Sequence, residues 1–466
     1  MLLCSSITLA LLALSSTSAS AVPETLSRIT VPLVRNYNGQ LAQEKRSLRF
    51  DKRQEQQQDD SVLNSEFLIE IEIGEPSQRF NVTVDTASSQ LWVPSTSEAQ
   101  TQRRSYEQFN ATASSTFKPS QVPFTMIDYK GTQVNGSYGV DTVTLGGSLK
   151  VDQQVVGLVN DRDNQIFTEQ SQNYGVIGFG FPGLNLLSGN TRRDHNIPVV
   201  FNLLYNNVIS EPVFSVYFDK EGAGELSIGG IDESKLKEND VKLTYAPVLA
   251  YHVKQPPEEE QQKKKQQQQQ LQTTYLYWVV AGLRLDSSFG YEYDFSSDDK
   301  KKTIAYQPLI LDTGSALSYA PRPVVDDIIA SLIQKDTDAA KYDESLFATG
   351  AYTIDCSYGI PAEKTKDKDF IQFNIATGSD RDDEKVFKLT VPIHQLVIPL
   401  DNDDVKEAKT CVFGIAPVPS VPENEDGGRA FASGGSYFLG ESVLRSVYTV
   451  YDMEQYRVGF ASLLSF

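Results

Sequence analysis

Two short segments, far apart in this chain, nearly repeat each other: VDTAS at residues 84–88 and LDTGS at residues 311–315. Each follows a mainly apolar run, which is typical of a buried strand that leads an aspartate into a tight turn. A single copy would be explained by ordinary turn capping. Two copies in opposite halves predict instead that Asp85 and Asp312 meet between two lobes. Two carboxyl groups in one site can share a proton and direct water at a peptide bond.

The chain has 466 residues, which is enough for two lobes with full hydrophobic cores. An apolar-rich run at residues 2–14 leads into STSASA at residues 16–21. This pattern predicts a secretory signal peptide, residues 1–21, cleaved after Ala21. A membrane anchor is the alternative, but the run is too short to span a bilayer comfortably. We therefore expect a secreted protein, extracellular or associated with the cell wall, and no membrane partner.

The charge is unevenly distributed along the chain. The whole chain has a net charge of −19, yet the segment before Gln54 contains more basic than acidic residues and has a net positive charge. The acidic body makes nucleic-acid binding improbable. A basic leader before an acidic body indicates a pro-segment, residues 22–53, held partly by electrostatic contacts that weaken as carboxylates protonate. Lys52-Arg53, ahead of a polar stretch, predicts cleavage by a kexin-type processing protease, and Lys45-Arg46 is a second candidate.

The remaining chain divides into an N-terminal lobe at residues 54–245, an inter-lobe segment at 246–274 and a C-terminal lobe at 275–466. The inter-lobe segment contains a Gln/Glu/Lys-rich insertion that is too polar to bury, which predicts a disordered loop. Alternating and apolar runs predict a mainly β chain. The expected strands are residues 67–73, 80–84, 140–145, 214–218, 275–285, 387–391 and 448–460, and the expected short helices are 198–206 and 324–333.

Five landmarks occur in a specific order: VDTASSQLWVP at residues 84–94, IDY at 127–129, GVIGFG at 175–180, DTGS at 312–315 and FLG at 438–440. With them the chain, from about residue 66 to 460, resembles the pepsin-like aspartic proteases, and among these the secreted yeast candidapepsins and yapsins. The resemblance implies a bilobal, mainly β fold with the active site in the cleft between the lobes. It also implies an aspartic endopeptidase that hydrolyses proteins or peptides at acid pH.

The resemblance assigns roles within the two turns. Asp85 and Asp312 are expected to form the catalytic pair, with one carboxyl group as base and the other as acid. Thr86 and Thr313 are expected to hydrogen-bond across the lobe interface. Ser88 and Ser315 supply hydroxyl groups that can bond the outer carboxylate oxygens. Ordinary turn capping is the alternative for these four support residues.

A flap is expected at Tyr129 and Gly131, with the Tyr129 hydroxyl group near the Trp92 indole; core packing is the alternative for both aromatic residues. The chain departs from the family at Ala87, where glycine is usual, and at Lys130, which separates Tyr129 from glycine. A methyl group at position 87 would crowd the turn if the backbone there required glycine. These departures leave an alternative open: an inactive protease-fold protein that binds peptides or cell-wall material.

Two cysteines remain in the mature chain, Cys356 and Cys411, since Cys4 lies in the signal peptide. In an oxidising compartment they predict one disulfide, with two buried free thiols as the alternative. The spacing of Cys and His residues does not suit a metal, so we expect neither metal nor cofactor. Asn110 and Asn135 are the candidate glycosylation sites. Nothing in the sequence indicates an oligomer, and we expect a monomer.

Overall fold

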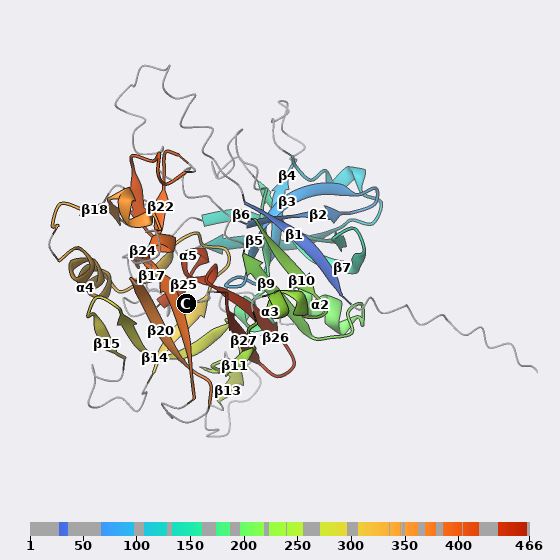
Figure 1. Ribbon diagram of the computed structural model, residues 1–466. Helices are drawn as coiled ribbons and strands as arrows, with labels where there is room; N and C mark the ends of the chain where they lie inside the picture. The colour runs from blue at the N-terminus through green and yellow to red at the C-terminus, as the bar shows by residue number, and fades with distance from the viewer. Residues whose placement is uncertain are drawn as a thin grey trace, which may run out of the picture.

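The computed structural model (Figure 1) describes residues 28–35, 67–96, 107–127, 133–160, 174–186, 196–218, 223–238, 240–254, 271–295, 306–334, 336–344, 346, 350–361, 369–378, 385–402, 404–418 and 437–463. The predicted signal peptide, the Lys52-Arg53 and Lys45-Arg46 pairs and most of the polar insertion lie outside these residues. In Figure 1 the blue-to-green strands of the first half and the yellow-to-orange strands of the second half form two β-rich bodies. This is the mainly β, bilobal architecture predicted from the sequence.

The largest sheet has 13 strands and crosses the boundary between the two halves. Its strands, in the order in which they pair, are β11 (Thr244–Pro247), β27 (Arg457–Ser462), β26 (Val447–Asp452), β9 (Val213–Phe218), β10 (Ala223–Ile228), β1 (Ile29–Arg35), β2 (Phe67–Ile73), β3 (Gln78–Asp85), β8 (Val176–Gly178), β4 (Leu91–Ser95), β7 (Leu149–Asn160), β6 (Gln133–Leu145) and β5 (Lys118–Ile127). The C-terminal strands β26 and β27 therefore complete a sheet that consists mainly of first-half strands.

The second half has smaller sheets of its own. An eight-stranded sheet contains β21 (Val386–Pro392), β20 (Phe370–Ala376), β14 (Val279–Ser287), β16 (Gln307–Leu311), β25 (Tyr437–Leu439), β17 (Ser318–Ala320) and β24 (Ile415–Pro417), with β15 (Glu292–Asp294) paired to β14. A four-stranded sheet contains β18 (Ala340–Asp343), β19 (Ala351–Ile354), β23 (Cys411–Phe413) and β22 (Val397–Pro399). A separate hairpin pairs β12 (Tyr251–Lys254) with β13 (Leu271–Thr274).

The described α-helices are short: α2 (Val199–Tyr205), α3 (Glu233–Glu238), α4 (Arg322–Ile333) and α5 (Glu441–Leu444). The two helices predicted from the sequence correspond to α2 and α4. The described 3-10 helices are η3 (Ala111–Ala113), η4 (Pro182–Leu186), η6 (Cys356–Gly359) and η7 (Ile393–Leu396). Across the described residues, we find no helix that combines the length and the apolar character needed to traverse a lipid bilayer.

Strand β1 belongs to the predicted pro-segment and lies inside the large sheet. It pairs antiparallel with β10 from Ile29 onward and with β2 at its C-terminal end. Val31 and Leu33 are buried in the hydrophobic core. Arg28, just before the strand, forms an ion pair with Asp232 at 3.4 Å. Backbone pairing and apolar burial thus accompany the electrostatic contacts that the basic leader suggested.

Each half repeats one arrangement of three strands around its aspartate. In the first half, β3 runs parallel to β8, and β8 pairs antiparallel with β4. In the second half, β16 runs parallel to β25, and β25 pairs antiparallel with β17. The apolar residues that precede each aspartate are buried because both strands lie in the interior of their sheets. The duplicated sequence motif therefore corresponds to duplicated local structure.

Several expected strands have different bounds, and the strand expected at residues 140–145 already begins at Gln133. The run at residues 448–460 forms the hairpin β26–β27, because the Asp452 carboxylate accepts the backbone N–H groups of Glu454 and Gln455 at 3.2 and 2.9 Å and closes a turn. The strand expected at residues 275–285 begins only at Val279. The four residues before Val279 instead contact the first half of the chain, as described below.

Candidate active site

The turns that contain Asp85 and Asp312 meet through a reciprocal pair of threonines. The Thr86 hydroxyl group donates to the carbonyl of Leu311 at 2.8 Å, and the Thr313 hydroxyl group donates to the carbonyl of Val84 at 2.7 Å. Each hydroxyl oxygen also accepts the backbone N–H of the other threonine, at 3.2 and 3.1 Å. Both threonines are buried. Four hydrogen bonds shielded from water thus fix one turn against the other.

The Asp85 carboxyl group packs directly against the backbone of the opposite turn. A Cβ atom added at Gly314 would lie only 2.7 Å from Asp85 Cγ, so the carboxyl group occupies the space that a side chain would need. The N–H of Gly314 donates to Asp312 Oδ1 at 3.0 Å. In the first turn, the N–H of Ala87 donates to Asp85 Oδ1 at 2.7 Å in the same way. Each aspartate therefore accepts the N–H of the residue two positions after it, and the Asp85 carboxyl group lies against Gly314 of the opposite turn.

Burial raises the pKa of the Asp85 carboxyl group, because removal from water disfavours its charged form. The backbone N–H of Ala87 and the N–H and hydroxyl groups of Ser88 act in the opposite direction, since they favour the carboxylate. The effect of burial is the larger one, so the pKa of Asp85 lies above its ordinary value. A carboxyl group that retains its proton beside a second carboxyl group is the arrangement required for shared acid and base roles.

Ala87 fits its turn without backbone strain. Four non-glycine residues among the described residues have a positive φ angle, and Ala87 is not one of them. Its side chain is half-buried and packs against the main hydrophobic core. The departure from glycine at this position therefore does not distort the turn that contains Asp85.

Comparison with known protein families gives one match over most of the chain. The model of the family described as "Eukaryotic aspartyl protease" matches residues 66–463. The chain belongs to this family. Family membership identifies the protein as an aspartic-type endopeptidase, which agrees with the resemblance inferred from its sequence.

Individual relatives of this aspartyl protease are similar at modest identity. Mucorpepsin of Rhizomucor pusillus is 26% identical over 86% of this chain and 79% of its own length. Secreted aspartic protease 7 of Candida albicans is 25% identical over 84% of this chain and 59% of its own length. Chymosin of Camelus dromedarius is 34% identical, but over 37% of this chain and 43% of its own length.

The expected flap is a hairpin of β5 and β6 in this aspartyl protease. Tyr129, Lys130 and Gly131 come between these two strands in the sequence and lie outside the described residues. Trp92 on β4 is buried in a small cluster that includes Phe124 on β5, which pairs with Gly136 on β6. Its expected contact with Tyr129 stays a prediction. Its packing joins β5 to β4, the strand that follows the turn containing Asp85.

Ser88 is half-buried beside Asp85, whereas Ser315 is almost fully buried and its carbonyl accepts the N–H of Glu441 at 2.8 Å. That bond attaches the second turn to the start of α5. The expected contact of the Ser315 hydroxyl group with Asp312 stays a prediction.

Tyr277 is a residue that sequence reasoning missed. It lies immediately before β14, and both Asp85 and Asp312 contribute to raising the pKa of its phenol, although burial is the larger cause. The influence of both carboxyl groups places Tyr277 at the candidate active site. Tyr251, at the base of the insertion hairpin, packs edge-on against it, with ring centroids 6.4 Å apart. The sequence offered little to identify Tyr277, because it lies beside Trp278 within residues 275–285, which were interpreted as one continuous strand.

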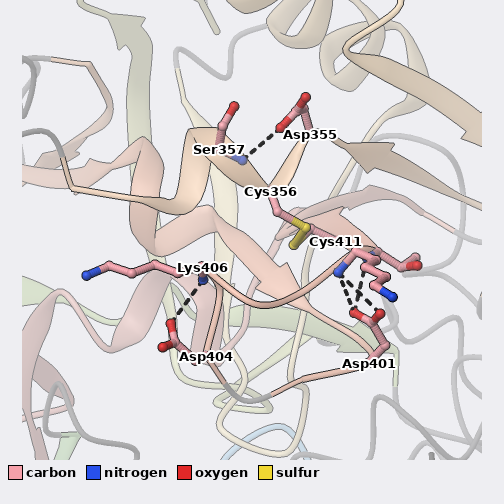
Figure 2. The surroundings of a disulfide bond; sticks show 9 residues. Asp355, Cys356, Ser357, Asp401, Asp404, Lys406 and Cys411 are labelled. Atoms are coloured by element: carbon pink, nitrogen blue, oxygen red, sulfur yellow. Dashed lines mark hydrogen bonds between the residues drawn. A yellow bond between two sulfur atoms is a disulfide. The ribbon is translucent and has the colours of Figure 1, made fainter.

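Cys356 and Cys411 form a disulfide that links η6 to β23 (Figure 2). The predicted pairing is therefore present in the structure. The surrounding loops are capped by carboxylates: Asp355 accepts the N–H of Ser357, and Asp401 accepts the N–H groups that precede Cys411. The disulfide therefore joins two segments within the second half of the chain.

The two candidate glycosylation sites are placed differently. Asn110 is exposed and caps η3, where its side-chain oxygen accepts the N–H of Thr112 at 3.1 Å. Asn135 is half-buried on β6. Among the described residues, no group of three or more His, Cys, Asp or Glu side chains could hold a metal ion.

Proposed function

We propose that this aspartyl protease is a secreted endopeptidase that hydrolyses peptide bonds of proteins at acid pH through the pair Asp85 and Asp312. The observation that supports the proposal best is the position of the Asp85 carboxyl group against Gly314, between the two turns. A water molecule between the carboxyl groups would be within reach of both. Only one of the two groups can ionise readily in such a site.

In the proposed reaction the carboxylate of the pair takes a proton from water, and the water oxygen attacks the peptide carbonyl carbon. The protonated carboxyl group hydrogen-bonds the carbonyl oxygen, where negative charge develops. A proton then passes to the peptide nitrogen as the C–N bond breaks. We assign these roles to the pair and not to single residues, because the shared proton belongs to both.

The acid pH optimum follows from the same pair. Burial raises the pKa of Asp85, so one proton remains on the pair over an acidic range. As the pH rises through that shifted pKa, the second proton is lost and the acid of the pair disappears. We also propose secretion by way of residues 1–21 and maturation at Lys52-Arg53, so that the mature enzyme begins at Gln54.

The test uses the Asp85→Asn and Asp312→Asn variants of the secreted protein. Digestion of a peptide library at acid pH should be abolished in both variants, while circular dichroism shows an unchanged fold. A statine-type transition-state mimic should inhibit the natural enzyme. Full turnover in either variant would exclude the pair, and an inactive natural chain that still binds peptides would support the alternative of a peptide-binding protein.

A further inference from the structure

A buried tryptophan connects the strands that lead to the two aspartates. Trp278 lies just before β14 and has no exposed surface. Its indole N–H donates to the backbone carbonyl of Phe179 at 2.8 Å, in the first half of the chain. Its own backbone carbonyl accepts the N–H of Leu311 at 2.9 Å, in the second half. One residue therefore bonds to both halves.

Both partners of Trp278 lie next to the catalytic turns. Phe179 follows β8, and its N–H donates to the carbonyl of Asp85 itself at 2.7 Å. Leu311 is the residue before Asp312. A continuous series of backbone and indole hydrogen bonds thus runs from Asp85 to the residue before Asp312, beneath the threonine pair. No side chain of the catalytic turns takes part in it.

The indole ring is held in a fixed orientation by surrounding aromatic rings. Phe181 packs 4.3 Å from it, and Tyr451 and Phe214 meet it edge-on at 5.1 and 5.6 Å. A second backbone bond, from the N–H of Phe181 to the carbonyl of Leu276 at 3.3 Å, aligns the same two segments. A phenylalanine could fill much of this space, but it could not donate the hydrogen bond. Packing alone would therefore be satisfied by a phenylalanine, and only the hydrogen bond to Phe179 requires a tryptophan here.

We propose that Trp278 is a positioning residue that sets the relative placement of the two catalytic turns through its indole bond to Phe179. The inference rests on the proposed function of Asp85 and Asp312. Without the indole donor, the buried carbonyl of Phe179 lacks this partner, and the segment that supports Asp85 can shift relative to β16. Shifts of a catalytic group by less than 1 Å reduce turnover more than they reduce substrate binding.

The test is the Trp278→Phe variant of the full secreted chain, assayed with a peptide substrate at acid pH and at a temperature where every variant is folded. We expect kcat per folded molecule to fall about tenfold, while KM changes less than twofold. The matched control is Phe201→Leu. Phe201 is buried on α2 and packs 5.5 Å from Phe181, one ring further from the indole. This control should lower the melting temperature and keep kcat within twofold.

A second variant separates the hydrogen bond from the shape of the side chain. Site-specific incorporation of β-(3-benzothienyl)alanine at position 278 keeps the bicyclic ring and removes the N–H. It should lower kcat as Trp278→Phe does, and it decides the question if the phenylalanine variant fails to fold. A kcat within twofold of the natural enzyme in this isostere would overturn the inference. Absence of turnover in the natural chain would instead overturn the proposed function, and this inference with it.

Discussion

Replacing Gly314 by alanine perturbs the contact on which the proposed pair depends. The added methyl carbon would lie 2.7 Å from Asp85 Cγ and 2.9 Å from Asp85 Cβ. Carbon atoms in contact prefer about 3.5–4.0 Å, so the carboxyl group would have to move by about 1 Å. Gly314 does not have a positive φ angle, so the backbone itself accepts alanine. The effect would therefore be a displacement of the catalytic group and not a general loss of folding.

A misplacement of about 1 Å can reduce a rate about 100-fold, which corresponds to about 2.7 kcal/mol of transition-state stabilisation. We expect kcat of the Gly314→Ala variant to fall by about that factor with a nearly unchanged KM. The assay is hydrolysis of a chromogenic peptide at acid pH, with the folded fraction measured by circular dichroism.

The matched control is Ala87→Gly at the equivalent position of the first turn. Because Ala87 is unstrained there, the change should alter kcat/KM by about tenfold or less, roughly 1.4 kcal/mol. A folded Gly314→Ala variant that keeps kcat within threefold of the natural enzyme would refute the placement of Asp85 against this glycine. A rise from no activity to robust activity in Ala87→Gly would show that the natural chain is an inactive binding protein.

The structure supports three further predictions. Asp85→Asn should raise the melting temperature more at pH 7 than at pH 3. The pKa of the half-buried Asp85 is raised in the folded state, so ionising it costs folding free energy that is absent below its ordinary pKa of 3.8 and grows above it; equal shifts at both pH values would contradict this. N-terminal sequencing should find the secreted chain beginning at Gln54, and a start at Val22 would contradict processing. Native mass spectrometry at neutral pH should find the cleaved pro-segment still bound through β1, because the apolar residues of this strand are buried. Peptide mapping should find glycan at Asn110 more often than at Asn81, which is half-buried within β3; the reverse order would argue against the accessibility of η3.

The duplicated motif allowed the sequence to predict the two strand-to-turn segments that contain Asp85 and Asp312, because an apolar strand followed by Asp-Thr is a local pattern. The alternation at residues 67–73 likewise defined β2 with its bounds unchanged. Local patterns were sufficient where a strand is half-buried and ends in a turn. The disulfide followed from the count of cysteines and the expected compartment.

Features that depend on distant partners were not predictable in this way. The role of Trp278 depends on Phe179, about 100 positions away, and apolar periodicity cannot name a hydrogen-bond acceptor. The basic residues around β1 directed attention to electrostatic contacts, so its contribution to the core was not predicted. The turn within residues 448–460 was missed because the apolar residues on both sides of it were interpreted as one continuous strand, although Asp452, Glu454 and Gln455 lie between them.

The order of strands in the large sheet has a consequence for how the protein forms on the ribosome. β9 receives its second neighbour only from β26, near the C-terminus, while its first neighbour, β10, follows it almost immediately. During synthesis one edge of β9 therefore stays unpaired until almost the whole chain has left the ribosome. Such long-range pairing is slow and exposes the nascent chain to aggregation. We expect the first half expressed alone to be poorly soluble and to recover its fold when the β26–β27 hairpin is supplied as a separate peptide.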